Sequence, residues 1–109
     1  MNKREIIVYE TSNGINPLEV WFSSIKDPVT RFKIAARIDR IKLGNLGDWK
    51  SLGNSIYELK FHFSSGYRVY YSELDNLVIL LLCGGNKSSQ NRDIKKAKEY
   101  LKDYKERTK

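Results

Sequence analysis

Apolar residues in the first half of this chain follow a strand-like and then a helical spacing. Residues 6–9 form a short run rich in β-branched side chains, which predicts a first strand. Asn16, Pro17 and Glu19 together give a helix start signal, an N-cap followed by proline and a capping-box glutamate. The apolar face of this predicted helix consists of Leu18, Trp21, Phe22 and Ile25.

A second helix is predicted directly after the first. Asp27 and Pro28 repeat the start signal, and the helix is expected to end near Gly44. One stripe of this helix is apolar and another is basic: Ile34, Ile38 and Ile41 against Lys33, Arg37 and Arg40. The two helices are expected to form an antiparallel hairpin.

The second half of the chain predicts three strands and a last helix. Residues 44–54 contain three glycines and predict a loop. Residues 55–63 then alternate, with Tyr57, Leu59, Phe61 and Phe63 on one side and Glu58, Lys60 and His62 on the other. Turns at 64–66 and 75–76 lead into strands over 67–73 and 77–83, the latter a nearly continuous apolar run typical of a central strand. Ser88 or Ser89 is expected to cap a final helix whose inner face carries Ile94, Ala97, Leu101 and Tyr104.

These elements predict a single α+β domain over residues 1–109, in the order β-α-α-β-β-β-α. The expected architecture is a twisted, mainly antiparallel sheet with the helices packed on one face. That arrangement leaves the other face, with the polar side of residues 55–63, available for function.

Charge and the rarer residues narrow the class of protein. The chain has 20 Lys and Arg against 13 Asp and Glu, a net charge of +7, which favours a polyanionic partner or else reflects solvated lysine-rich helix surfaces. Cys83 and His62 are the only residues of their types, so neither a disulfide nor a conventional zinc site is expected. No segment resembles a signal peptide or an apolar membrane span, and we expect a cytoplasmic protein without a metal or a small-molecule cofactor.

Two cations at the ends of neighbouring predicted strands are the main candidates for chemistry. Arg68 lies at the start of one strand, and Lys87 follows the next strand, just before a helix N-terminus where anions are favoured. Together with Lys60 they can surround a phosphate group. Whether Arg68 and Lys60 share a face depends on the register of the turn between their strands. In a purely structural interpretation, Arg68 is instead a cross-strand partner of Glu58.

RNA cleavage without a metal requires a base, an acid and cations that stabilise the phosphorane. Arg68 suits charge stabilisation because its planar guanidinium binds two phosphate oxygens and stays charged. The remaining candidates are grouped by role: Glu58 or His62 as base, His62 or Asp93 as acid, and Lys60 or Lys87 as additional cations. Tyr70 can stack on bases, and Gln90 and Arg92 complete the candidate RNA-binding set.

The motifs that carry these residues resemble those of a known family. Gly66-Tyr67-Arg68-Val69-Tyr70-Tyr71 and Leu80-Leu81-Leu82-Cys83-Gly84-Gly85-Asn86-Lys87-Ser88-Ser89-Gln90, with Tyr57-Glu58-Leu59-Lys60 before them and Arg92-Asp93-Ile94 after, resemble the RelE/ParE toxin superfamily, and more narrowly its HigB-like branch. The resemblance extends over nearly the whole chain.

The resemblance implies the toxin of a type II toxin–antitoxin pair, an endoribonuclease that cleaves mRNA on the ribosome and is neutralised by a helix-turn-helix antitoxin of the HigA kind. It places Arg68 at the phosphate-binding arginine position, Lys60 at a strand lysine and Lys87 at a basic position after the last strand. Glu58 stands where RelE has a further strand lysine, and the C-terminal catalytic tyrosine is replaced near Asp93, so the acid–base pair does not transfer from RelE. The alternatives are a ParE-like inhibitor of DNA gyrase and a non-catalytic RNA-binding module.

Overall fold

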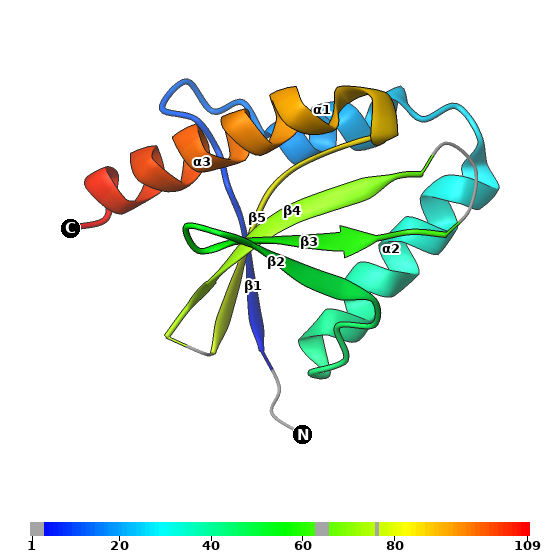
Figure 1. The fold of residues 1–109 in the computed structure, drawn as a ribbon, viewed down its shortest axis with the longest axis horizontal. Helices are drawn as coiled ribbons and strands as arrows, with labels where there is room; N and C mark the ends of the chain where they lie inside the picture. The colour runs from blue at the N-terminus through cyan, green and yellow to red at the C-terminus, as the bar shows by residue number, and fades with distance from the viewer. Residues whose placement is uncertain (1–3, 63–65, 76) are drawn as a thin grey trace.

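The computed structural model describes residues 4–62, 66–75 and 77–109, and its centre is a five-stranded sheet (Figure 1). The strands are β1 (Glu5–Val8), β2 (Trp49–Gly53), β3 (Ile56–Lys60), β4 (Arg68–Leu74) and β5 (Val78–Gly85), in the spatial order β1-β5-β4-β3-β2. β1 pairs with β5 in parallel and the other neighbours pair antiparallel. The protein is therefore an α+β structure with a mixed, mainly antiparallel sheet, as the pattern predicts. The predicted inward position of Phe63 and the turn residues Ser64, Ser65 and Asn76 lie outside the described residues.

The helices begin where the sequence signals predict. They are α1 (Pro17–Ser24), α2 (Pro28–Lys42) and α3 (Gln90–Arg107), with a short 3₁₀ turn, η1 (Lys87–Ser89), before α3. Asn16 Oδ1 accepts a hydrogen bond from the Glu19 amide at 3.1 Å, and Asp27 Oδ1 accepts one from the Val29 amide at 3.2 Å. Ser89 does stand immediately before α3, but its side chain makes no cap hydrogen bond to the helix backbone.

The segment predicted as a loop contains a strand, so the order of elements differs from the prediction. The three glycines of residues 44–54 all adopt positive φ, and β2 begins after the second of them and ends at the third. β2 pairs antiparallel with β3, and the rings of Trp49 and Tyr57 meet edge to face with centroids 6.0 Å apart. Pairing with β3 thus stabilises an edge strand, which the glycines in this segment made look like a loop in the sequence.

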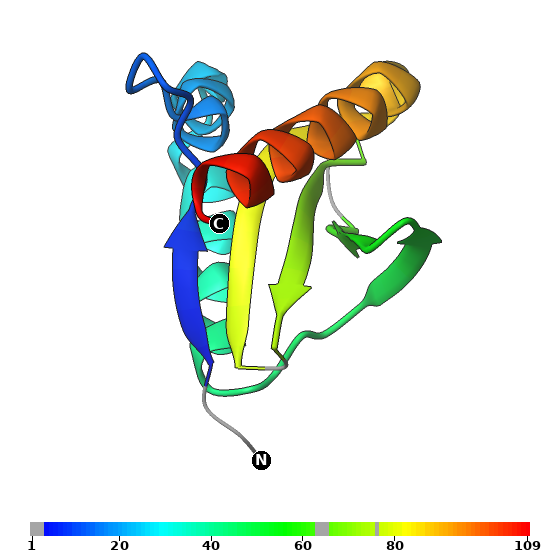
Figure 2. The same cartoon turned by 90° about the vertical axis from the view of Figure 1, so that its left-hand side faces the viewer.

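The helices cover both faces of the sheet, which corrects the expectation that they share one face. Figure 2 shows α3 crossing in front of the strands, with α2 behind them. One buried cluster joins α1 and α2 to Leu59, Val69 and Tyr71, and a second joins α3 to Tyr70 and other sheet residues. The polar side of β3 therefore faces a helix. Since both of its faces are covered, β5 is apolar along nearly its whole length.

The second half of α3 is tied to the segment that follows β1. Tyr9 Oη donates to Asp103 Oδ2 at 2.6 Å, and its ring stacks on Tyr100 with centroids 4.9 Å apart. Arg107 donates to the carbonyl of Glu10 and pairs with Asp103 at 2.9 Å. These contacts fix the C-terminal helix against the N-terminal strand. None of the helices in the described part of the chain is both long and apolar enough to cross a membrane.

Candidate functional site

The register between β3 and β4 places four candidate residues on one face of the sheet. Glu58 is opposite Tyr70, and Lys60 is opposite Arg68. Because side chains alternate along a strand, these four residues all project toward the α3 side. The register thus answers the question that the sequence left open: Arg68 and Lys60 share a face.

Arg68 and Glu58 form a buried ion pair on this face. Arg68 Nε lies 3.1 Å from Glu58 Oε1, and the two residues are 8% and 0% exposed. The Nε–H is not aligned as a hydrogen bond. Gln90 Nε2, at the start of α3, donates to the same carboxylate oxygen at 3.1 Å, and Arg68 Nη1 donates to the carbonyl of Gly66 at 2.7 Å. The predicted cross-strand partnership of Arg68 and Glu58 is confirmed.

Tyr70 lies beside this pair and is fully buried. Burial, and then the negative charges of Glu58 and Asp93, raise the pKa of Tyr70 above its ordinary value. Within the described ranges, the hydroxyl of Tyr70 and Oε2 of Glu58 are buried without a hydrogen-bond partner. The expectation that Tyr70 stacks on RNA bases is therefore wrong, because its ring packs in the α3-side core.

Lys87 approaches the turn that holds Arg68. Gly66 has a φ of +67°, and a Cβ built on it would lie 3.4 Å from Arg68 Nη1 and 3.5 Å from Lys87 Cβ. Arg68 and Lys87 are thus neighbours around Gly66, and Lys87 is exposed at the start of η1. The Cβ of Lys87 therefore lies near the Arg68 guanidinium.

Asp93 is a buried residue that holds the start of α3. Its Oδ2 accepts a hydrogen bond from Ser89 Oγ at 2.5 Å, and it is 8% exposed. A Cβ on Gly85 would lie only 1.8 Å from the same oxygen, so a side chain at position 85 would clash with the carboxylate. The Asp93 carbonyl accepts a long hydrogen bond from Cys83 Sγ at 3.6 Å. Burial raises the pKa of Cys83 to about 12, which keeps the thiol protonated.

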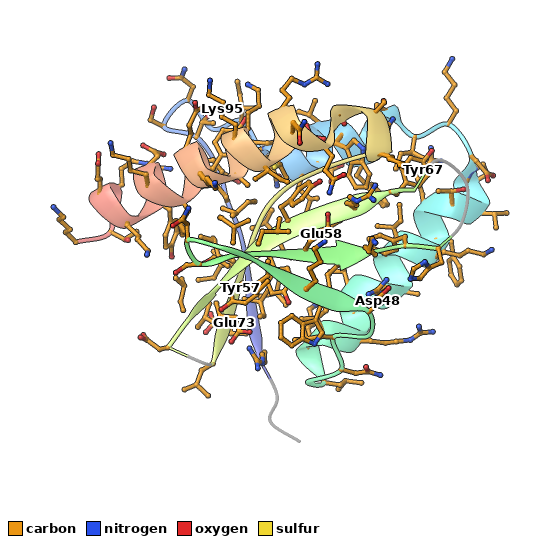
Figure 3. All side chains as sticks on the ribbon, in the orientation of Figure 1. Asp48, Tyr57, Glu58, Tyr67, Glu73 and Lys95 are labelled. Atoms are coloured by element: carbon orange, nitrogen blue, oxygen red, sulfur yellow. The ribbon has the colours of Figure 1, made fainter. Side chains whose placement is uncertain are left out.

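His62 and Arg92 lie outside the Arg68–Glu58 pair. His62 Nε2 pairs with Asp48 Oδ2, and this hydrogen bond is the largest cause of the lowered pKa of Asp48. Figure 3 labels Glu58 near the middle of the sheet and Asp48 nearer its edge. His62 lines a groove with residues of α2, whereas Arg92 is exposed in the first turn of α3. The candidate acid–base residues Glu58, His62 and Asp93 therefore have three different environments.

Arg37 organises the end of β3, a role that sequence analysis missed. Its guanidinium donates to the carbonyls of Lys60 and of Asp48, the latter at 2.6 Å, and lies 4.8 Å from the ring centre of Phe61. Desolvation by burial lowers its pKa. The sequence gives Arg37 only as one member of a basic stripe on α2. Nothing in that stripe distinguishes a residue bound to backbone carbonyls from one in solvent.

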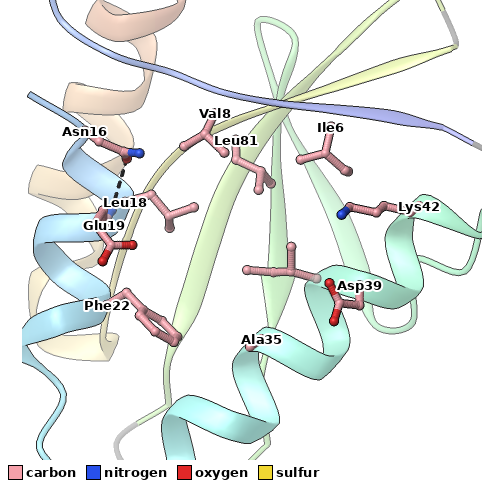
Figure 4. Close-up of a pocket in the computed structure, with 11 residues that line it drawn as sticks. Ile6, Val8, Asn16, Leu18, Glu19, Phe22, Ala35, Asp39, Lys42 and Leu81 are labelled. Carbon is pink, nitrogen blue, oxygen red and sulfur yellow. Dashed lines mark hydrogen bonds between the residues drawn. The ribbon is translucent and has the colours of Figure 1, made fainter. Parts of the chain in front are cut away.

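A separate hollow of about 370 Å³ lies between β1, α1 and α2 (Figure 4). Apolar side chains, including Leu18, Phe22 and Leu81, line most of it, and Asp39 and Lys42 stand on its α2 side. It contains none of the candidate site residues. In the described part of the chain, no group of three or more His, Cys, Asp and Glu side chains is placed to hold a metal ion.

Fold and site together define a small, basic α+β protein with a buried Arg–Glu pair beneath its C-terminal helix. No family model matches the chain. It is 46% identical over 78 residues to a protein of Haemophilus influenzae described as an uncharacterized protein, a match that covers 72% of this chain and 79% of that relative. The chain belongs to the same family as that protein.

Proposed function

We propose that this protein is the toxin of a type II toxin–antitoxin pair and cleaves mRNA on the ribosome. The observation that carries the proposal is the convergence of Arg68 and Lys87 around Gly66, next to Lys60 on the same face. Three basic residues from neighbouring parts of the fold, on a chain of net charge +7, suit a phosphate group of RNA. The resemblance to the RelE/ParE superfamily supplies the substrate class and a HigA-like antitoxin as the protein partner.

In this proposal Arg68 is the residue that stabilises charge on the scissile phosphate. Among the described residues its guanidinium donates one hydrogen bond, from Nη1 to Gly66, and Nε is buried against Glu58, so the other Nη donors remain for phosphate oxygens. Glu58 and Gln90 fix the guanidinium in place rather than act on the 2′-hydroxyl, because Glu58 is fully buried. Lys87, which is exposed, supplies the second cation.

A non-catalytic RNA-binding module is the second candidate, and the burial of the Arg68–Glu58 pair favours it. A pair that is 8% and 0% exposed can serve the fold whether or not RNA is cut. In that case Lys60, Lys87 and Arg92 would hold an RNA backbone, and the transcript would remain intact.

The deciding experiment is primer extension on a reporter mRNA after induced expression. Since Arg68→Ala alone would leave the Glu58 carboxylate buried and unpaired, the variants are Arg68→Lys and the double change Arg68→Ala with Glu58→Gln, each checked for folding by circular dichroism. We expect cuts within the translated frame for the natural chain and none for the folded double variant. Intact transcripts together with inhibited DNA supercoiling would instead identify a gyrase inhibitor. Restored growth on co-expression of the neighbouring gene would support an antitoxin partner.

A further inference from the structure

A second cationic surface lies on the opposite side of β3 from the Arg68–Glu58 pair, along α2. A groove of about 290 Å³ runs there between α2 and the residues that follow β3. Its lining residues are Phe32, Lys33, Ala36, Arg37, Arg40, Phe61 and His62. We call it the α2 groove. It contains the basic stripe of α2, which the proposed function does not use.

Positive charge dominates the α2 groove. Lys33, Arg37 and Arg40 recur at the three- and four-residue spacing that brings side chains onto one helix face, and Lys33 and Arg40 are exposed. Asp48, paired with His62, is a carboxylate at its border, and Asp27 lies close enough to Lys33 for their charges to interact. Arg37 is engaged by backbone carbonyls, which fixes the floor of the groove and leaves Lys33 and Arg40 on its outer side. Such a surface suits a phosphate backbone.

An aromatic side chain stands in solvent beside these cations. Phe32 is 73% exposed, more than any other large apolar side chain in the described part of the chain, although it lies two residues from the fully buried Ile34. An exposed ring next to Lys and Arg is the arrangement with which proteins bind single-stranded nucleic acid, since the base stacks and the phosphate pairs. A duplex would keep its bases stacked on one another and out of reach of the ring.

We propose that the α2 groove binds a nucleotide of single-stranded RNA, with its base on Phe32 and its phosphate on Arg40 and Lys33. The choice of RNA rests on the proposed function. Lys60 connects the two sites, because its carbonyl accepts from Arg37 in the groove floor and its strand partner is Arg68. In this proposal an RNA strand whose phosphate lies at Arg68 passes around the end of β3, from one face of the sheet to the other, to reach the groove.

The test measures binding separately from cleavage. The probe is a fluorescent single-stranded RNA of about 12 nucleotides, a length within known single-strand site sizes, with 2′-O-methyl groups that remove the attacking hydroxyl. Fluorescence anisotropy is recorded over a salt series. The matched pairs of variants on the same helix are Phe32→Ala with Val29→Ala, and Arg40→Gln with Lys42→Gln; Val29 and Lys42 are exposed and do not line the groove.

We expect Phe32→Ala to raise the Kd by at least about fivefold, and to have no effect on a probe that lacks bases. Arg40→Gln should reduce the slope of log K against log salt by about 0.7, the value for one phosphate on a single strand. The control Val29→Ala should leave the Kd unchanged. The control Lys42→Gln should leave the salt slope unchanged. The proposal is overturned if each variant and its control behave alike, if a duplex of equal length competes as well, or if the chain binds an acidic peptide and not the RNA.

The outcome is distinguishable from failure of the proposed function. A chain that binds the probe through Phe32 but cuts no transcript would refute the nuclease and keep the α2 groove. If cleavage requires Arg68 but the Kd does not change in Phe32→Ala, the nuclease is supported and the α2 groove is refuted.

Discussion

Arg68 Nε lies 3.1 Å from Glu58 Oε1 beneath α3, and both side chains are almost wholly removed from solvent. A buried ion pair gives little net stability, because desolvation offsets the attraction, but removal of one partner leaves an uncompensated charge. Gln90 adds a hydrogen bond to the same carboxylate, so the pair also joins the start of α3 to the sheet.

Replacement of Glu58 by alanine should lower the free energy of unfolding by about 3 to 5 kcal/mol, because Arg68 is left buried and unpaired. The comparison is Glu73→Ala, which breaks the less deeply buried pair with Arg4, at 2.9 Å and with both side chains 20% exposed, and should cost less than Glu58→Ala. Urea unfolding of the purified chains measures both. The double variant Glu58→Met with Arg68→Met should recover much of the loss, because apolar side chains of similar volume leave no buried charge. Equal costs for Glu58→Ala and Glu73→Ala would mean that the Arg68–Glu58 pair is hydrated in solution.

Glycine at position 85 should be required by the Asp93 carboxylate. Since a Cβ there would lie 1.8 Å from Asp93 Oδ2, Gly85→Ala should destabilise by about 2 kcal/mol, the usual cost of overpacking. Asp93→Ala should relieve that clash, so the double variant should be less destabilised than the sum of the two single changes by about 1 kcal/mol or more.

The control for this coupling is Gly84→Ala. A Cβ at Gly84 would meet Trp21 at 2.3 Å and not Asp93, so Asp93→Ala should not relieve it. Thermal unfolding of the two double-mutant cycles makes the comparison. Additive effects in the Gly85 cycle would show that the clash lies elsewhere.

The link between Tyr9 and Asp103 should make stability depend on pH at the acid end. Hydrogen bonds, first from Tyr9 and then from Arg107, lower the pKa of Asp103 below its ordinary 3.8. A carboxylate with a lowered folded-state pKa stabilises the protein above the unfolded-state pKa, and this contribution is lost as pH falls through the folded-state pKa. Wild type should therefore exceed Asp103→Asn in stability near neutral pH, and the difference should shrink as pH falls below 3.8 and vanish below the folded-state pKa. Urea midpoints across this range test it, with Asp39→Asn as the exposed control. A difference that is constant with pH would rule out a role for the charge.

The sequence predicts the paired strands and helices well because their signals are local. Caps at Asn16 and Asp27 and the alternation around Leu59 determine where chain segments turn and which side chains point inward. Two features depend on distant partners instead. β2 is stabilised by pairing with β3, and the carboxylate of Glu58 looks solvent-facing until a helix from the far end of the chain covers it.

The sequence alone could name the candidate residues, but which of them share a face depends on the register between β3 and β4. Arg68 and Lys60 share a face because residues 57–60 pair with residues 68–71, and this register depends on the turn between the strands rather than on any residue type. The long apolar run of β5 did indicate a sheet covered on both faces, a signal that argued against helices on one side only. The burial of Tyr70 under α3 and the position of His62 beside α2 depend on helices that pack on opposite faces of the sheet, and could not be derived from spacing.

If the proposed function is right, cleavage should depend on the cation next to Arg68 and not only on the overall positive charge of the chain. Lys87 is a neighbour of Arg68 around Gly66, whereas Lys102 is exposed on α3 beside Asn54. Either alanine replacement lowers the net charge equally, from +7 by one unit. Lys87→Ala should slow cleavage of a reporter mRNA by about tenfold or more, because a cation at the scissile phosphate stabilises the transition state, and Lys102→Ala by less than about twofold. Time courses of primer extension at matched protein levels give both rates. Equal slowing by the two variants would mean that the lysines attract RNA without forming a site.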